Sequence, residues 1–330
     1  MICSYCQKDG RMTGEHIIPQ ALLDMFPECD FNIRYDKEIK YFKSENIVIN
    51  DVCDNCNNVI LSELDSYGSG MVRDYFVNTY EAEDKLVLPY NYSLLSRWLL
   101  KIMFNIARTK KSEIQTTSFE SNLDYILGRT ETSAMPISVF GGLSVDMTPL
   151  PEFFFDNMKL GVFFNPIFVK GSLIELVNPL ENEFRVNKEK ENMEFKKLLL
   201  SCVLRFGSGM FLVLLWEEEI TPTEKQTMER LIEHLYPYAL LKSDFENTTI
   251  KRSTHAYNYH HYYIIDTSAG LSMADQTNSF LPTRNNPSEL RKTSSVEWDQ
   301  HVTKLRENRA SKRQKERDRK RKRKNKKVKN

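Results

Sequence analysis

The stretch Val52-Cys53-Asp54-Asn55-Cys56-Asn57-Asn58 decides how the first part of this chain folds. Its two cysteines are separated by two residues, and the same spacing separates the two cysteines near the start of the chain. A tight turn of this kind supplies two thiolates to one metal ion, and two such turns complete the tetrahedron that zinc prefers. We therefore expect one structural Zn²⁺ bound by four cysteines: Cys3, Cys6, Cys53 and Cys56.

Two further cysteines stand outside this pattern. Cys202 lies in the apolar run 198–204, which predicts a small residue of the core. Cys29 is expected to be a free thiol and is the one alternative zinc ligand. Because the first residues show no charged-then-apolar secretory pattern, we expect reduced thiols and a cytoplasmic protein.

The charge of the chain is divided unevenly. The 330 residues hold 46 basic and 45 acidic side chains, but residues 304–330 alone hold 16 and 3, which leaves 30 and 42 for the rest. An acidic body with a basic tail suggests that the tail contacts a polyanion. The densest basic run is expected to bind nucleic acid through its phosphates: Lys320, Arg321, Lys322, Arg323 and Lys324. A solubilising extension or a localisation signal remains the alternative.

A second motif lies just after the first cysteine pair. Glu15-His16 is followed by Ile-Ile-Pro, and the second cysteine pair runs into Asn57 and Asn58 at the start of an expected helix. With the paired cysteines, these residues resemble the HNH endonuclease superfamily, in the branch whose ββα-metal unit is held by two Cys-x-x-Cys knuckles. The resemblance covers residues 1–65. It implies a zinc-stapled, treble-clef nuclease module and nucleic acid as the substrate.

The chemistry of these side chains agrees with the resemblance. Phosphodiester hydrolysis needs a base that activates water and a cation that stabilises the charge developing on phosphate. The imidazole side chain of a histidine ordinarily titrates near neutral pH, so His16 is the expected general base. The resemblance implies that Glu15 and Asn57 or Asn58 are ligands of a catalytic metal, and oxygen ligands of this kind suit Mg²⁺ or Mn²⁺. The alternative is that His16 is a structural residue of a non-catalytic zinc module.

Two features depart from the usual pattern of the superfamily. An asparagine stands where the last motif position is usually a histidine, and the insert 26–43 is longer than in a minimal module. The central asparagine of the motif has two candidates, Asn46 and Asn50, which stand seven and three residues before Cys53.

Beyond residue 76 the pattern is that of a mixed helical and stranded protein. Apolar residues at helical spacing between 94 and 106 predict an amphipathic helix, and the run 210–216 after a Gly-Ser-Gly turn predicts a central strand. Thr221-Pro222-Thr223-Glu224 is a capping box that begins another helix. No apolar run is long enough to span a membrane.

We therefore predict an α+β fold with four parts. These are a nuclease module at 1–76, an α+β domain of unstated role at 77–266, a linker at 267–303 and a disordered basic tail at 304–330. The segment 254–266 alternates tyrosine and histidine, including His255, His260 and His261. An aromatic strand is the favoured interpretation of that segment, ahead of metal binding or base stacking.

The function expected from these features is metal-dependent endonuclease activity, with DNA favoured over RNA. Two other classes of function stay open. One is a non-catalytic zinc-knuckle protein that binds nucleic acid, and the other is an effector toxin whose body, residues 77–266, binds a protein partner.

Overall fold

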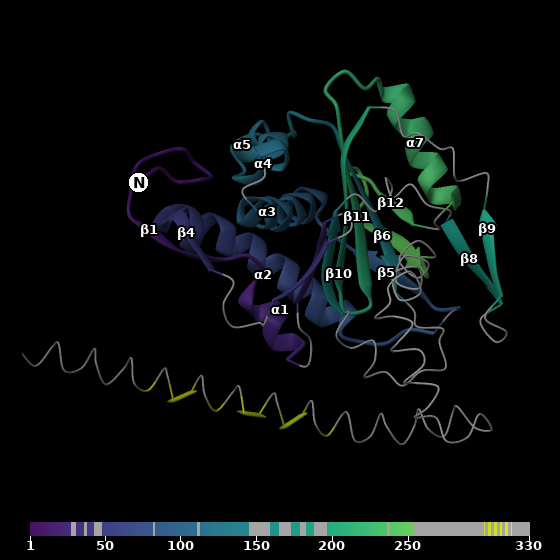
Figure 1. Ribbon diagram of the computed structural model, residues 1–330, viewed down its shortest axis with the longest axis horizontal. Coiled ribbons are helices and arrows are strands. Elements are labelled where there is room, and N and C mark those ends of the chain that lie inside the picture. The colour runs from purple at the N-terminus through teal and green to yellow at the C-terminus, as the bar shows by residue number, and fades with distance from the viewer. Residues whose placement is uncertain are drawn as a thin grey trace, which may run out of the picture.

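The computed structural model shows a mixed helical and stranded protein (Figure 1). The residues that it describes are 1–27, 31–35, 38–42, 48–81, 83–110, 113–144, 159–164, 173–178, 183–187, 197–235, 238–253 and single positions between 300 and 318. No helix in these ranges has the length and apolar character needed to cross a membrane.

A seven-stranded sheet forms the centre of the molecule. Its neighbours are antiparallel, except that β2 runs parallel to β7. In spatial order the strands are β12 (Ala239–Leu241), β6 (Ile137–Leu143), β11 (Gly209–Trp216), β10 (Leu198–Phe206), β7 (Leu160–Phe164), β2 (Phe31–Tyr35) and β3 (Glu38–Phe42). Residues from both sides of position 76 therefore share one sheet.

The predicted hairpin and central strand are confirmed. β10 and β11 pair from Leu198 opposite Trp216 to Phe206 opposite Gly209, and Gly207 in the turn has φ +64°, which a residue without Cβ adopts at little cost. Along β11, Phe211 and its alternate neighbours face one hydrophobic cluster, while Leu212 and its alternate neighbours face a second. This alternation places apolar cores on both faces of the sheet.

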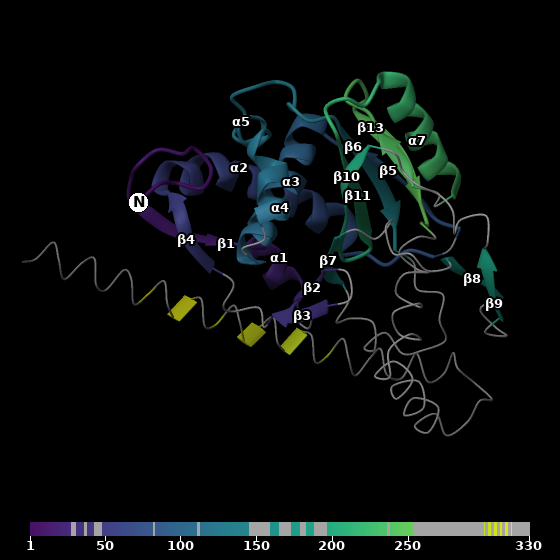
Figure 2. The ribbon, with the colours of Figure 1, turned by 45° about the horizontal axis from the view of Figure 1, so that its top comes forward.

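Helices cover both faces of the sheet (Figures 1 and 2). On one face lie α3 (Tyr92–Lys110), α4 (Glu113–Glu120), α5 (Leu123–Ile126) and α2 (Ser62–Met71), which is flanked by the π-helical turns η1 (Cys56–Leu61) and η2 (Val72–Phe76). On the other face lies α7 (Pro222–Leu235). The capping box predicted for α7 is present, since Glu224 N donates to Thr221 Oγ1 and Thr221 N donates to Glu224 Oε2.

The N-terminal unit contains two antiparallel strands followed by the long helix η1–α2–η2. The strands are β1 (Met12–His16) and β4 (Val48–Cys53), with the short helix α1 (Gln20–Met25) between them. Two smaller pairs complete the described strands: β5 (Lys85–Pro89) with β13 (Asn247–Lys251), and β8 (Leu173–Asn178) with β9 (Glu183–Asn187).

Helix α3 joins this unit to the sheet. Its apolar side chains belong to the same hydrophobic cluster as those of α1, α2 and the inner sheet face. At Gly68, a Cβ atom would come within 2.0 Å of the Trp98 ring, so only glycine lets α2 approach α3 this closely. The close approach places the polar side chains of α2 beside those of α3.

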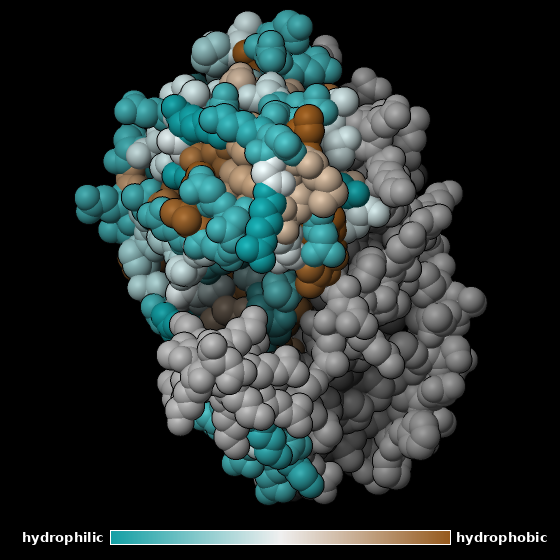
Figure 3. Space-filling view, turned by 90° about the vertical axis from the view of Figure 1, so that its left-hand side faces the viewer, coloured by the Kyte–Doolittle hydropathy of each residue, from teal (hydrophilic) through white to brown (hydrophobic). Residues whose placement is uncertain are grey.

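The surface above the N-terminal unit is mainly hydrophilic. Figure 3 views this side of the molecule, and its hydrophobic areas are separated by polar residues. Cys202 is fully buried in β10, as predicted for a core residue.

Candidate functional site

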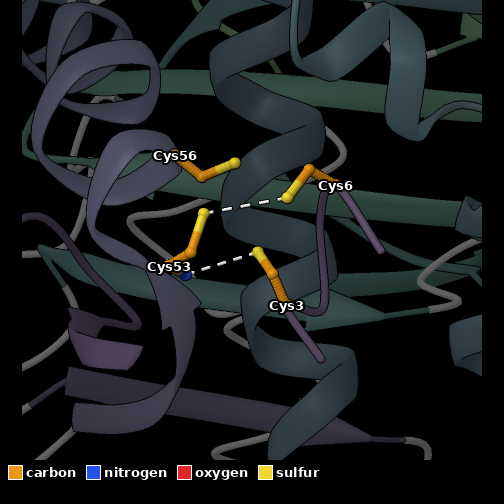
Figure 4. Close-up of side chains that lie close together, drawn as sticks. All are labelled: Cys3, Cys6, Cys53 and Cys56. Carbon is orange, nitrogen blue, oxygen red and sulfur yellow. Dashed lines mark hydrogen bonds between the residues drawn. The ribbon is translucent and has the colours of Figure 1, made fainter. Parts of the chain in front are cut away.

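The four paired cysteines meet at one point. Cys3 and Cys6 lie in the N-terminal turn, Cys53 ends β4 and Cys56 begins η1. Their sulfur atoms all lie within 4.8 Å of one another and point toward a common centre (Figure 4). The Sγ atoms of Cys6 and Cys53 are 3.7 Å apart. A tetrahedral zinc ion with Zn–S bonds of about 2.3 Å requires sulfur atoms about 3.8 Å apart. The four cysteines therefore fit a zinc ion.

The electrostatics of the cysteine cluster also favour a bound cation. Burial opposes ionisation of Cys3, but backbone N–H groups of Cys53, Cys6 and Tyr5 outweigh it and lower the pKa of Cys3 to about 7. Burial raises the pKa of Cys56, and the neighbouring thiols raise it further. Four thiols this close cannot all ionise beside one another without a cation, and a bound metal supplies that charge.

A cleft of about 510 Å³ lies between β1, α1 and the helix η1–α2–η2. It collects the residues predicted from the second motif, because Glu15, His16, Asn57 and Asn58 all line it. Residues on later turns of the long helix continue the polar wall: Ser62, Asp65, Ser66, Ser69 and Arg73.

Asn57 connects the start of the long helix to β1. Its amide nitrogen Nδ2 donates to Thr13 Oγ1 at 2.9 Å and to the carbonyl oxygen of Gly14 at 3.0 Å. Both hydrogen bonds use the amide nitrogen, and no hydrogen bond among the described residues engages the amide oxygen. Asn58 instead donates to Asp54 Oδ1 at 2.7 Å within the same helix. Of the two asparagines, Asn57 is the one fixed against the strand that carries Glu15 and His16.

Glu15 lies in the interior and is already paired with a cation. Its side chain is 4% exposed, and Glu15 Oε1 lies 2.7 Å from Nζ of Lys101 on α3. The same Nζ lies 2.6 Å from Asp65 Oδ2 on α2, so one ammonium group bridges two carboxylates. The Lys101 side chain is fully buried.

A second residue of α3 holds the strand that carries the motif. Asn105 Nδ2 donates to Glu15 Oε1 at 3.1 Å and to the carbonyl oxygen of His16 at 3.2 Å. On its other side, Asn105 Oδ1 accepts from the hydroxyl of Tyr5 at 2.6 Å and from the guanidinium of Arg108. Because Tyr5 stands between Cys3 and Cys6, Asn105 connects the cysteine cluster to the Glu15-His16 segment.

The predicted pair of catalytic metal ligands does not fit an open, water-rich metal site. The amide oxygen of Asn57 faces no hydrogen-bond donor among the described residues, but Glu15 is buried and its Oε1 is held by Lys101 and Asn105. A hard divalent cation that keeps several water ligands needs exposed carboxylate oxygens. We therefore assign no catalytic step to a metal ion at this pair.

Sequence reasoning missed three residues of this site: Asp65, Lys101 and Asn105. A signal for the first was present, because polar residues recur every three or four positions along the helix from Asn58 to Arg73, which marks one polar helix face. Lys101, Asn105 and Arg108 likewise share one face of an otherwise apolar helix.

Several predicted residues lie outside the described part of the chain. They are Cys29, Asn46, the histidines of segment 254–266 and the basic run Lys320, Arg321, Lys322, Arg323 and Lys324. Asn50 is described, and it is exposed on β4. Comparison with protein-family models, curated proteins and solved structures finds no match to the chain.

Proposed function

We propose that this protein is a nuclease that hydrolyses phosphodiester bonds of nucleic acid, with DNA favoured and His16 as the general base. The observation that carries the proposal is the cleft, in which His16 lies with Asn57 beside a four-cysteine cluster fit for zinc. The HNH-like spacing of these residues along the chain supports the same proposal. Mg²⁺ or Mn²⁺ as a catalytic cofactor stays a prediction of that resemblance.

His16 is placed to act on a water molecule in the cleft. Its backbone is held by Asn105, while no hydrogen bond among the described residues engages its imidazole. A histidine imidazole facing the cleft can take a proton from water as that water attacks phosphorus. The guanidinium of Arg73, exposed at the edge of the same cleft, suits contact with a phosphate of the backbone.

Replacing His16 tests the proposal. His16→Ala should lower the cleavage rate by about 10²–10⁴-fold, because a positioned base is lost, while zinc content and the unfolding transition stay unchanged. The assay is cleavage of plasmid DNA and of RNA by the full chain, with and without Mg²⁺ or Mn²⁺. His234→Ala is the matched control, since His234 lies in α7 on the opposite face of the sheet. Wild-type cleavage by His16→Ala, or loss of its zinc, would contradict the role of His16.

A non-catalytic module that binds nucleic acid is the second candidate, and the burial of Glu15 in an ion pair favours it. The same assay separates the two candidates. A wild-type protein that binds DNA or RNA but cleaves neither under any metal condition is a binding module.

The basic tail should raise affinity without adding sequence preference. A chain truncated before Lys304 should bind nucleic acid more weakly and with a flatter salt dependence, because fewer phosphate contacts release fewer counterions. Affinity measured from low to moderate salt gives the slope of log K against log salt. Equal slopes for the full and truncated chains would show that the tail makes no phosphate contact.

A further inference from the structure

Lys101 occupies an unusual position for a lysine. Its side chain is fully buried, it comes from the middle of α3, and its ammonium contacts one carboxylate of β1 and one of α2. Charged groups are buried in proteins only when other groups compensate the lost hydration. Here Glu15 and Asp65 provide that compensation at 2.7 Å and 2.6 Å.

The lysine is charged in this environment. Burial alone lowers the pKa of Lys101, but the charges of Asp65 and Glu15 and their hydrogen bonds outweigh it, so the net pKa is raised. For Asp65 the balance is opposite. Burial raises the pKa of that carboxyl, Lys101 lowers it, and the negative charge of Glu15 adds to the rise, so the net pKa of Asp65 is raised. The cluster holds two acidic groups and one basic group, so a single cation organises both carboxylates.

A divalent metal that bridged the same two carboxylates would need the same space. Mg²⁺ lies about 2.1 Å from its oxygen ligands, and an ammonium nitrogen lies within 3 Å of the oxygens that it bridges. Two cations cannot share this gap, because they would overlap and repel each other.

We propose that Lys101 is the resident cation of the Glu15 and Asp65 carboxylates, and that Glu15 is therefore a positioning residue and not a ligand of a divalent metal. The inference concerns the site of the proposed function, but it does not require that the protein cleaves nucleic acid.

The hydrogen bonds around Glu15 explain what it positions. Glu15 Oε1 accepts from Asn105 Nδ2, and the same amide donates to the carbonyl oxygen of His16. With Lys101 in place, Glu15 fixes Asn105, and Asn105 fixes the backbone of His16. The ion pair thereby helps to hold the backbone that carries the imidazole at the cleft.

Binding of Mn²⁺ alone tests this proposal. Free Mn²⁺ is measured by electron paramagnetic resonance in the presence of the full-length, zinc-loaded protein. Glu15→Gln should bind Mn²⁺ with wild-type affinity, because the carboxylate that it loses is not a ligand. Lys101→Met should bind Mn²⁺ about tenfold more tightly than wild type, because two carboxylates are left without their cation. Mn²⁺ should also raise the melting temperature of Lys101→Met and not that of wild type.

Lys225→Met is the matched control. Lys225 also pairs with a carboxylate, Glu229 at 2.5 Å, but on α7 and with its side chain 26% exposed. Its replacement should leave Mn²⁺ affinity unchanged. The double variant Lys101→Met/Glu15→Gln should lose the added affinity.

Three results would overturn the proposal. They are weaker Mn²⁺ binding by Glu15→Gln than by wild type, a folded Lys101→Met with no gain in Mn²⁺ affinity, and a gain that persists in the double variant. If Lys101→Met does not fold, the comparison of wild type with Glu15→Gln still decides whether Glu15 is a ligand. Because Mn²⁺ binding requires no cleavage, an inactive wild type would refute the nuclease proposal and leave this test intact.

Discussion

The cysteine cluster and the carboxylate cluster solve the same electrostatic problem in different ways. Each gathers acidic groups that are buried or partly buried, and each needs positive charge to hold them together. The four thiols fit a metal ion from solution, whereas Glu15 and Asp65 receive a lysine from the chain itself. We therefore expect folding to depend on metal at the first cluster and on the packing of α3 at the second.

The two clusters also differ in how far along the chain their parts lie. The cysteines come in pairs from two turns of the N-terminal unit, so all four candidate zinc ligands lie within that unit. Lys101 stands 36 positions after Asp65, and Asn105 stands 90 positions after Glu15. The Glu15-His16 segment is thus held by a helix outside the segment that carries the motif.

Removing a zinc ligand should have the largest effect on stability. Structural zinc contributes an apparent 10–16 kcal/mol or so in small zinc-finger peptides, so Cys53→Ser should lose zinc and unfold the N-terminal unit. Elemental analysis should find one zinc per chain in wild type, and circular dichroism should report the unfolding. Cys202→Ala, which removes a buried thiol elsewhere, should retain zinc. Folded wild-type protein without zinc would show that the cysteine cluster does not need a metal ion, and the contrast with the lysine-held carboxylates would then be wrong.

Removing the resident cation should have the next largest effect. Lys101→Met leaves the buried carboxylate of Glu15 and the partly exposed carboxylate of Asp65 without their cation, and breaking a buried ion pair in this way costs about 3–5 kcal/mol. Urea unfolding in the absence of divalent cations measures the loss. Lys225→Met should cost about 1 kcal/mol or less, because its ion pair is partly exposed. Equal losses of unfolding free energy for the two variants would mean that Lys101 stabilises the fold no more than a partly exposed lysine does.

Local patterns in the sequence predicted the parts of the site that are local in the chain. The Cys-x-x-Cys pairs, the hairpin before Phe211 and the capping box at Thr221 each lie within a few residues, and the structure confirms the cysteine cluster, the hairpin and the cap. The meeting of Glu15 with Lys101 depends on how α3 packs against β1, and that packing is decided by the whole core. The parallel pairing of β2 with β7 was beyond sequence reasoning for the same reason.

Asn105 should rank third among the substitutions. Asn105→Ala removes the donor to Glu15 and to the His16 carbonyl, and leaving such buried groups without a partner costs about 1–3 kcal/mol. Asn50 was a sequence candidate for the asparagine that orients the motif, but it is exposed, so Asn50→Ala should change stability by about 0.5 kcal/mol or less. Urea unfolding of both variants decides which asparagine holds the segment. A larger loss of stability for Asn50→Ala than for Asn105→Ala would favour Asn50 as the asparagine that orients the motif.

The smallest expected effect tests whether the two clusters are energetically linked. The hydroxyl of Tyr5, which stands between Cys3 and Cys6, donates to Asn105 Oδ1 at 2.6 Å. Tyr5→Phe removes that hydrogen bond and keeps the ring, which packs edge-on against Phe104, so the loss should be about 0.5–1.5 kcal/mol.

A double-mutant cycle isolates the coupling between the two residues. If the hydrogen bond transmits order from the zinc cluster to the Glu15-His16 segment, Tyr5→Phe and Asn105→Ala should lose less together than the sum of their separate losses, with a coupling energy of about 0.5 kcal/mol or more. Urea unfolding of the zinc-loaded single and double variants gives that energy. Strict additivity would mean that the two clusters, although joined by one asparagine, are stabilised independently. The cysteine cluster and the carboxylate cluster would then be close in space but not coupled in their contributions to stability.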